Sequence, residues 1–487
     1  MSTIRISSRA EHNHLRQSHW DKLARKKTAA HLGATNAGET FFNREYHRRL
    51  NEIYRLLVPP GLDVLEIGCG SGDLLKAVAP ARGVGIDFSE KMLTLARQRH
   101  PELSFIQADA HDLQPGSQFD VLILSDLVND VWDVQTVLEQ LRPLCKPDTR
   151  VILNFYSRVY QPILGLAGAL GLANRLLPQN WLTPEDTENL LHLAGFEVIR
   201  RQREILLPLP IPLLRELFNK ILVKVWPFNP LAWTNILIAR PQPQAEPEVL
   251  SVSVIIPARN EAGNIEAAFQ RIPKMGSHTE LIFVEGHSKD DTYATIEKAI
   301  RNHPEWDARL FTQPGKGKAD AVRVGFDQAK GEVLMILDAD LTVRPEELPR
   351  FYAALASGKG EFINGVRLVY PMQEQAMRFL NLLGNKFFSL AFSWLIGQPI
   401  KDTLCGTKVL RKHHYERIVA NRAYFGEFDP FGDYDLIFGA AKQNLKIVDL
   451  PIRYQDRTYG STNIDRWRHG VLLLRMVAIA AFRLKFI

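Results

Sequence analysis

Cysteine is scarce in this chain of 487 residues. It occurs three times, at Cys69, Cys145 and Cys405, and no two of these residues form the C-x-x-C pair of many zinc and redox sites. The scarcity excludes a disulfide framework and favours a reducing compartment, so we expect a cytoplasmic protein.

Long hydrophobic runs are also lacking. No stretch reaches the roughly 18 consecutive apolar residues that span a bilayer, and the first residues are polar, without the apolar core of a signal peptide. Shorter apolar runs occur at 163–173, 387–397 and 471–482. Such runs form either buried core helices or helices that lie on a membrane. We therefore expect no more than a peripheral contact with the inner face of a membrane.

A third missing feature is a basic stripe interleaved with aromatic residues, so we expect no nucleic acid partner. The net charge of +6 is a modest positive excess, which also suits phosphorylated substrates or an anionic membrane. With 46% hydrophobic and 23% charged residues, the chain has enough apolar material for more than one folded core.

A proline-rich segment, PQPQAEPE, divides the chain and predicts an extended linker. In both halves short β-branched runs alternate with amphipathic helical stretches, which predicts α/β layers with largely parallel sheets. We therefore expect two α/β domains. The predicted segments are a polar N-terminal extension (1–40), a first domain (41–240), the linker (241–250) and a second domain (251–487).

The first domain contains a glycine-rich turn after an apolar strand. Gly68, Gly70 and Gly72 permit a tight turn and let a ligand lie against bare backbone. This pattern alone is shared by nicotinamide-binding and methyl-transferring domains.

Two carboxylates make the pattern more specific. Asp87 ends a second strand, where it can accept hydrogen bonds from a ribose diol, and Asp109 ends a third, where it can reach an adenine amino group. Both lie at carboxyl ends of strands, where open α/β sheets bind ligands. A helix cap is the alternative role for Asp87, because Ser89 and Glu90 follow it.

On EIGCGSG, Asp87 and Asp109, residues 40–240 resemble class I S-adenosylmethionine-dependent methyltransferases. The resemblance implies a Rossmann-like sheet and S-adenosyl-L-methionine as cofactor, with the glycine loop at its methionine end and Glu66 at the family's acidic position. A nicotinamide enzyme is the alternative, but the third glycine comes too early for it. Asn154, Tyr156 and Tyr160 either line an acceptor site or are packing residues.

In the second domain, polar motifs follow four strand-like runs. They supply Pro257, Asn260 and Glu261, then Glu285, then Lys318 and Asp320, and finally Asp338 and Asp340. The last two are carboxylates one residue apart after a buried strand, an arrangement that is costly unless a cation offsets their repulsion. A hard divalent ion such as Mg²⁺ or Mn²⁺ binds few carboxylates and completes its shell with phosphate oxygens. We predict that Asp338 and Asp340 are metal ligands.

These motifs together resemble family 2 glycosyltransferases of GT-A fold, especially the dolichyl-phosphate-mannose-synthase-like group, over nearly all of 251–487. The resemblance implies a nucleotide-sugar donor, inversion at the anomeric carbon, and nucleotide contacts from the residues between Pro257 and Asp338. Gly286 replaces the second of two aspartates that read the base, so UDP- and GDP-sugars both remain open.

The resemblance also names residues on the acceptor side. Asp433 or Asp435 would take the proton of a hydroxyl acceptor, whereas Arg457 would hold a lipid phosphate. The alternative role of Asp433 and Asp435 is that of helix-cap or surface residues, and the alternative role of Arg457 is a plain salt bridge.

Two hypotheses follow for the whole chain. In the first, a bifunctional enzyme transfers a sugar to a polyprenyl-phosphate or glycan acceptor and methylates an unknown acceptor. In the second, the glycosyltransferase carries a methyltransferase-like module that only binds.

Overall fold

The computed structural model describes residues 8–31, 41–114, 116–169, 177, 179–243, 246–367, 369, 379–424, 433–453, 455, 459 and 466–486. Its contacts divide the chain into two compact units, with the division in sequence between Gln242 and Pro243. Each unit has a seven-stranded mixed sheet, and the predicted α/β class is confirmed.

Unit 1 has the strand order β3-β2-β1-β4-β5-β7-β6. The strands are β1 (Asp63–Ile67), β2 (Arg82–Asp87), β3 (Ser104–Gln107), β4 (Phe119–Ser125), β5 (Cys145–Tyr156), β6 (Phe196–Glu204) and β7 (Thr234–Pro241). The first five strands are parallel, and β7 runs antiparallel to β5 and β6. The carboxyl ends of the first five strands therefore share one edge of the sheet.

Two apolar cores lie on the two faces of this sheet. The helices are α1 (Arg9–His31), α2 (Phe41–Leu57), α3 (Asp73–Ala77), α4 (Glu90–Arg99), α5 (Val134–Glu139), α6 (Gln161–Ala169), α7 (Pro184–Leu193) and α8 (Leu214–Glu216). Short turns η1 (Arg142–Leu144), η2 (Arg158–Tyr160), η3 (Leu217–Ile221), η4 (Leu222–Lys224) and η5 (Asn229–Leu231) complete the unit. Helix α2 is amphipathic and buries Leu50, Tyr54 and Leu57 in one core, which fixes its position on the sheet.

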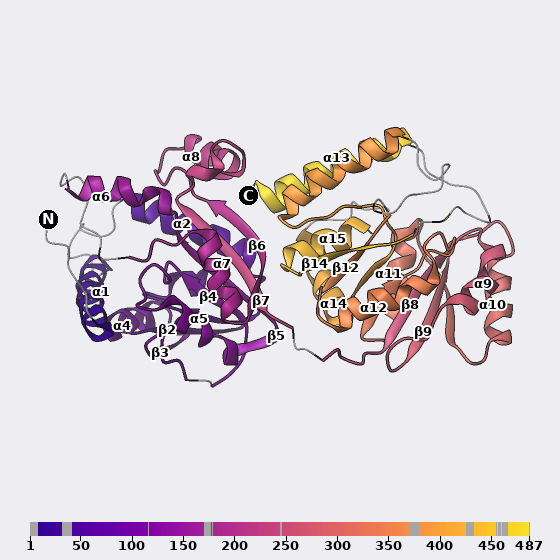
Figure 1. The fold of residues 1–487 in the computed structure, drawn as a ribbon, viewed down its shortest axis with the longest axis horizontal. Coiled ribbons are helices and arrows are strands. Elements are labelled where there is room, and N and C mark those ends of the chain that lie inside the picture. Colours follow the sequence, from indigo (N-terminus) through magenta and orange to yellow (C-terminus); the bar gives the residue numbers. More distant parts are fainter. Residues whose placement is uncertain are drawn as a thin grey trace. The chain divides into compact units, whose positions relative to one another are not determined.

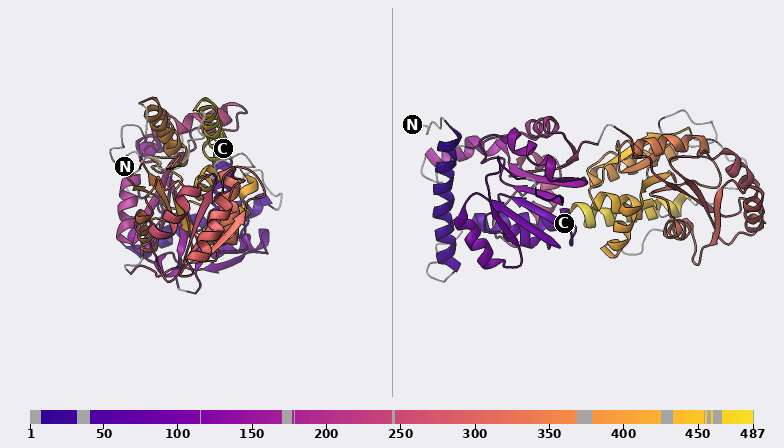
Figure 2. Two further views of the ribbon diagram at one scale, coloured as in Figure 1. Left: turned by 90° about the vertical axis from the view of Figure 1, so that its right-hand side faces the viewer. Right: turned by 90° about the horizontal axis from the view of Figure 1, so that it is seen from below.

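Residues 9–31, predicted as part of a polar extension, form α1. This helix packs against α4, as Figure 1 and the right-hand view of Figure 2 show. Its sequence lacks an apolar stripe, so periodicity gave no signal for it.

Unit 2 has the strand order β10-β9-β8-β11-β13-β12-β14. The strands are β8 (Val252–Ala258), β9 (Thr279–Glu285), β10 (Asp307–Thr312), β11 (Val333–Ile336), β12 (Phe362–Val366), β13 (Lys408–Arg411) and β14 (Ile447–Pro451). The four strands from β10 to β11 are parallel, and β13 is antiparallel to β11 and β12. Strands β9 and β11 are buried throughout, which explains the apolar runs LIFV in β9 and VLMI in β11.

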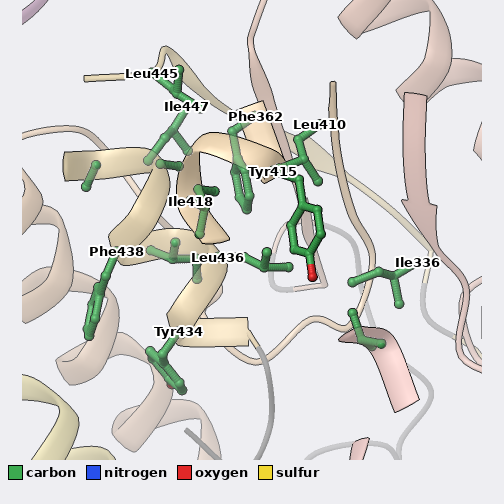
Figure 3. Packing of buried hydrophobic residues seen from close by; sticks show 14 of the residues in the cluster. Ile336, Phe362, Leu410, Tyr415, Ile418, Tyr434, Leu436, Phe438, Leu445 and Ile447 are labelled. Carbon is green, nitrogen blue, oxygen red and sulfur yellow. The ribbon is translucent and has the colours of Figure 1, made fainter. Parts of the chain in front are cut away.

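Helices cover both faces of this second sheet. They are α9 (Ile265–Arg271), α10 (Thr292–Asn302), α11 (Lys318–Gln328), α12 (Leu348–Ala356), α13 (Phe379–Ile396), α14 (Lys412–Ala420), α15 (Asp433–Lys442) and α16 (Arg466–Ala480), with turns η6 (Ala262–Asn264), η7 (Pro345–Glu347), η8 (Arg422–Tyr424) and η9 (Ala481–Lys485). Figure 3 shows one core, in which Ile418 of α14 and Phe438 of α15 lie with Phe362 of β12 and Leu410 of β13.

Helices α13 and α16 pack side by side. Among the helices that the structure describes, none is long and apolar enough to cross a membrane.

Candidate functional sites

The predicted glycine turn joins β1 to α3. Gly68, Gly70 and Gly72 have φ values of 76°, 51° and 74°, a region that favours glycine. A Cβ atom on Gly68 would lie 2.9 Å from Cδ1 of Leu127, and one on Gly72 would lie 2.8 Å from Cζ of Phe105. The turn therefore has no room for side chains at these two positions.

Asp87 ends β2 and ties this turn in place. Its Oδ2 accepts a hydrogen bond from the Gly70 N–H at 2.9 Å, and its Oδ1 accepts one from the Ser89 N–H at 2.9 Å. Burial raises the pKa of Asp87 in spite of these bonds. The cap of α4 is the Ser89 side chain, which accepts from the Met92 N–H, so capping is not the role of Asp87.

Glu66 lies within β1 and is only 2% exposed. Burial raises the pKa of its carboxyl group well above the ordinary value, partly offset by the Leu75 N–H. Its Oε2 has no hydrogen-bond partner within the described part of the chain. A buried acid with an unsatisfied oxygen is costly unless a ligand or water completes it.

Asp109 follows β3 and is held by α1. Its Oδ2 accepts from Nη2 of Arg9 at 2.8 Å and from Nδ2 of Asn13 at 2.8 Å, and its Oδ1 accepts from Nδ1 of His111 at 2.7 Å. Burial by itself would raise the pKa of Asp109, but the bonds from His111 and Arg9 hold it well below the ordinary value. The carboxylate is therefore charged at neutral pH.

Further contacts attach α1 to the same edge of the sheet. Arg16 pairs with Asp130, Asp21 pairs with Lys91 and also accepts from the Ser89 hydroxyl, and His12 lies edge-on to Trp132 at 5.6 Å. Sequence reasoning missed all of these residues because their partners are distant in sequence.

The predicted acceptor-side residues lie at the end of β5. Asn154 is fully buried, and Tyr156 is half-buried. The Tyr160 ring stacks on Trp233 at 3.7 Å, and its hydroxyl donates to the Leu231 carbonyl.

In unit 2 the predicted nucleotide-contacting residues follow β8 and β9. The half-buried Pro257 lies in β8, and Asn260 has a φ of 57°. The Asn260 N–H donates to Oγ of Ser288 at 3.0 Å, and its Oδ1 accepts from the Lys289 N–H at 2.7 Å. These bonds join the two loops into one rigid edge.

Two buried acids lie beneath these loops. The Glu261 N–H donates to Thr292 Oγ1, and its Oε2 accepts from Asn264 at 2.7 Å. Glu285 ends β9, and its Oε1 accepts from the Ser288 N–H. Both acids thus shape the loops, and the exposed side chains there include Arg259, His287 and Lys289.

The predicted metal ligands follow β11. The Asp338 carboxylate pairs with Nζ of Lys318 at 2.5 Å, and both side chains are half-buried. A Cβ atom on Gly406 would overlap Oδ2 of Asp338 and Nζ of Lys318, so a bare glycine faces this pair. Asp340 is half-buried, and its Oδ1 accepts from the Thr342 N–H and hydroxyl. The structure brings Asp338 and Lys318 together as one cluster with Gly406.

Asp320 contacts the loop that precedes α11. Its Oδ2 accepts from the Gly315 N–H at 2.7 Å, which closes the loop before α11. The contact therefore shapes the loop that carries Lys318.

Asp435 lies in α15, where it is 4% exposed. It accepts from Nε of Arg422 at 2.9 Å and lies 3.6 Å from Nη2 of Arg323. The Asp435 carboxylate is thus in contact with two guanidinium groups. Asp433 begins α15, but its side chain lies outside the described part of the chain, as does the whole of Arg457.

Comparisons with known proteins divide the chain in the same way. Residues 64–148 match the family model described as methyltransferase domain, and residues 253–419 match glycosyl transferase family 2. Solved structures similar to this chain include an S-adenosylmethionine-dependent methyltransferase from Mesorhizobium loti, with 21% identity and a TM-score of 0.31 over 39% of this chain and 96% of that one. A second is magnesium protoporphyrin IX methyltransferase from Synechocystis with bound SAH, with 19% identity and a TM-score of 0.31 over 48% and 97%.

Curated relatives match the second half. A dolichol-phosphate mannosyltransferase of Pyrococcus furiosus is 29% identical over 44% of this chain and 59% of its own length. Glycosyltransferase AglJ of Haloferax volcanii is 27% identical over 46% and 69%. A dolichol-phosphate mannosyltransferase of Saccharomyces cerevisiae is 34% identical over 22% and 41%. The chain spans less than two thirds of the first and third of these relatives. The two family matches nevertheless agree with the two α/β units, and the chain contains a methyltransferase domain and a domain of glycosyl transferase family 2.

Proposed function

We propose that unit 2 transfers a sugar, with inversion, from a UDP- or GDP-sugar to a polyprenyl phosphate, and that unit 1 methylates an acceptor with S-adenosyl-L-methionine. The observation that carries the first activity is the cluster of Asp338, Lys318 and the bare Gly406 beside Asp340, at the carboxyl edge of β11. Two carboxylates suit a metal ion, and one ammonium group suits the phosphate oxygens of a diphosphate bound to that ion.

The donor set fits a hard divalent cation. Asp338 and Asp340 offer carboxylate oxygens on one short loop, which Mg²⁺ and Mn²⁺ prefer. When bound, such an ion stabilises the negative charge that develops on a leaving nucleoside diphosphate. Lys318 would then bind a phosphate oxygen, because its partner Asp338 would turn to the cation.

The acceptor is proposed to be a lipid phosphate for two reasons. The relatives described above include two dolichol-phosphate mannosyltransferases by name. In addition, Asp435 is committed to Arg422 and Arg323, whereas a phosphate acceptor is already ionised and needs no base. A glycan hydroxyl acceptor, with Asp433 as its base, is the alternative.

A surface of α13 and α16 supports contact with a membrane. Phe387, Leu390 and Trp394 are exposed at helical spacing on α13, and Val471 and Leu474 are exposed on α16. Exposed Lys386 and Arg475 lie on the same two helices. Apolar side chains flanked by cations are typical of helices that rest on anionic lipid. We propose that the protein binds peripherally to the inner face of a cytoplasmic membrane.

The residues of unit 1 fit S-adenosyl-L-methionine. The glycine turn leaves bare backbone, Asp87 and Asp109 offer carboxylates at strand ends, and Glu66 has an unsatisfied buried oxygen. The bound cofactor would supply an electrophilic methyl group. A module that binds the cofactor without turnover is the alternative.

The test is nucleotide release by the full-length chain from a panel of UDP- and GDP-sugars. We expect release with Mn²⁺ or Mg²⁺ and undecaprenyl phosphate in phosphatidylglycerol vesicles, with which the protein should also sediment. Phosphatidylcholine vesicles without acceptor are the control. Absence of release from every donor by a folded protein would reject the glycosyltransferase proposal, and sedimentation without preference for anionic lipid would reject the membrane proposal.

Replacing Gly406 with alanine should lower nucleotide release at least tenfold, because the new methyl group would displace Asp338 and Lys318 from each other. Gly384→Ala is the matched control, since a Cβ atom there meets nothing within 4 Å. Equal initial rates for the two variants would show that the cluster is not part of the site.

A further inference from the structure

Unit 1 holds a polar cluster that the predicted cofactor contacts do not use. It lies at the carboxyl edge of the sheet and centres on Asp126, the residue after β4. Its Oδ1 accepts from the Tyr46 hydroxyl of α2 at 2.8 Å and from Nδ2 of Asn154 at 2.5 Å. The Tyr156 hydroxyl is a further hydrogen-bond partner. Tyr54 completes the cluster by donating to Oδ1 of Asn154 at 2.7 Å.

Asp126 itself has an unusual conformation. Its φ is 53°, in the left-handed region that few residues other than glycine adopt. Its side chain remains half-buried, whereas Tyr46 and Asn154 behind it are 3% and 0% exposed. Backbone strain of this kind collects at active sites. Asp126 is therefore the partly exposed member of a network whose other members Tyr46 and Asn154 are buried.

The cluster lies beside the glycine turn. Strands β1 and β4 are neighbours, with Glu66 opposite Ile123, so Gly68 and Asp126 follow at nearly the same level of the sheet. The contact that a Gly68 Cβ would make with Leu127 places the two loops against each other. Asp126 therefore lies next to the loop proposed to hold the methionine end of the cofactor, from which the methyl group is donated.

Aromatic side chains surround the same edge. Tyr46 and Tyr156 have ring centroids 5.7 Å apart, and Trp233 contacts both Phe42 at 5.1 Å and Tyr160 at 3.7 Å. Phe42, Tyr156, Tyr160 and Trp233 are all half-buried. Rings of this kind pack against the apolar face of a bound molecule while a nearby polar group contacts its hydroxyls.

The charge state of Asp126 suits proton transfer. Burial raises the pKa of Asp126 to about 7, opposed by the bonds from Tyr46 and Asn154 and reinforced by Asp130. The titratable groups around it are Tyr46 and Tyr54 of α2, Tyr156 of β5 and Asp130 of its own loop. A base whose pKa lies near the working pH is the most effective proton acceptor.

We propose that Asp126 is the proton acceptor for methyl transfer to a neutral hydroxyl compound, whose apolar face packs against Tyr156 and Trp233. The proposal rests on the proposed methyltransferase activity of unit 1. In the step, the acceptor oxygen forms a bond to the methyl carbon while the carbon–sulfur bond breaks. The electron pair of the broken bond stays on sulfur, which becomes part of a neutral thioether. The hydroxyl proton passes to the Asp126 carboxylate and then to solvent.

The test uses two ligands of the full-length protein in calorimetric titrations. S-adenosylhomocysteine lacks the methyl group, and sinefungin carries a cationic amine at the position of that group. If Asp126 faces the methyl group, the wild type should prefer sinefungin, and Asp126→Asn should reduce that preference at least fivefold. The preference of the wild type should also increase as the pH rises through about 7, because the Asp126 carboxyl loses its proton. The variant should show no such increase.

Several outcomes are distinguishable. Glu102→Gln, which removes an acid from an exposed ion pair with Lys76, should leave the ratio of the two affinities within twofold. Normal S-adenosylhomocysteine binding by Asp126→Asn shows that the variant is folded. An unchanged ratio in that variant would overturn the assignment of Asp126. Failure of the wild type to bind either ligand would instead reject the methyltransferase proposal.

The hydroxyl class of the acceptor has its own test. In protein saturated with S-adenosylhomocysteine, octyl β-D-glucoside should bind, because its hydroxyl groups can donate hydrogen bonds to the Asp126 carboxylate. No binding of the glucoside would show that the site does not take a neutral hydroxyl compound.

Discussion

Asp340→Asn should reduce the rate of nucleotide release from the preferred sugar donor by on the order of a thousandfold. The variant keeps the shape of the side chain and an oxygen that can accept from Thr342, but it loses the charge that would bind the cation. A metal ion contributes several kcal/mol to the stabilisation of a leaving diphosphate, and about 1.4 kcal/mol corresponds to a factor of ten. Initial rates at saturating Mn²⁺, together with the affinity for Mn²⁺ and nucleotide, measure the effect.

A matched control removes an acid from the opposite edge of the same sheet. Asp307 begins β10 and makes an exposed contact with His278. Asp307→Asn should leave both rate and affinity within twofold of the wild type. If Asp340→Asn retained its rate and its metal requirement, the metal site would have to be placed elsewhere.

Arg367→Ala should destabilise unit 2 by about 3–5 kcal/mol, the usual cost of leaving a buried charge without its partner. Asp402 is 2% exposed and accepts from Nε of Arg367 at 2.7 Å and from Nη2 at 2.9 Å. Since 1 kcal/mol shifts the melting temperature of a domain of this size by roughly 2–4 °C, the expected decrease is roughly 6–20 °C. Scanning calorimetry of the full-length chain measures it, and nucleotide with Mn²⁺ identifies the transition of unit 2.

The Arg367–Asp402 pair also determines how the destabilisation by Arg367→Ala changes with pH. Burial alone would raise the pKa of Asp402, but the charge and hydrogen bonds of Arg367 hold it below the ordinary value. Stability from a carboxyl with a lowered pKa is present above the unfolded-state pKa and is lost as the pH falls through the folded-state pKa. The difference between wild type and Arg367→Ala should therefore be largest at neutral pH and become smaller in acid.

An exposed pair provides the control for this prediction. Arg301 lies 3.3 Å from Glu297 on the surface of α10, with both side chains more than half exposed. Arg301→Ala should change stability by less than about 0.5 kcal/mol, as is usual for such pairs. A similar effect of both substitutions would mean that the Arg367–Asp402 pair is not buried in solution.

The sequence predicted the central strands β8, β9 and β11 well because apolar residues dominate each of them. Strands β6, β10, β12 and β13 were missed. Strands β6 and β10 mix charged and apolar residues and lie at edges of their sheets, whereas β12 and β13 are short strands inside the second sheet. Edge strands bury less of each residue, so their sequences carry a weaker pattern.

Among the site residues, too, some could be predicted from the sequence and others could not. The glycine turn and the Asp338 loop were predictable, because each requires unusual residues at fixed spacing within one short segment. Asp126 follows β4, and its importance depends on Tyr46, which is 80 residues away in sequence. No spacing rule connects residues from separate elements that meet only after folding.

The attachment of α1 has a consequence for the kinetics of ligand exchange. Arg9 holds Asp109 and Asp112 through ion pairs that are partly open to solvent, and such pairs become weaker as added salt shortens the distance over which charges interact. The helix covers a carboxylate proposed to contact adenine, so the rate at which nucleoside ligands enter and leave this edge should increase with ionic strength. Affinities measured at high and at low salt would then reflect different fractions of time that the helix spends detached.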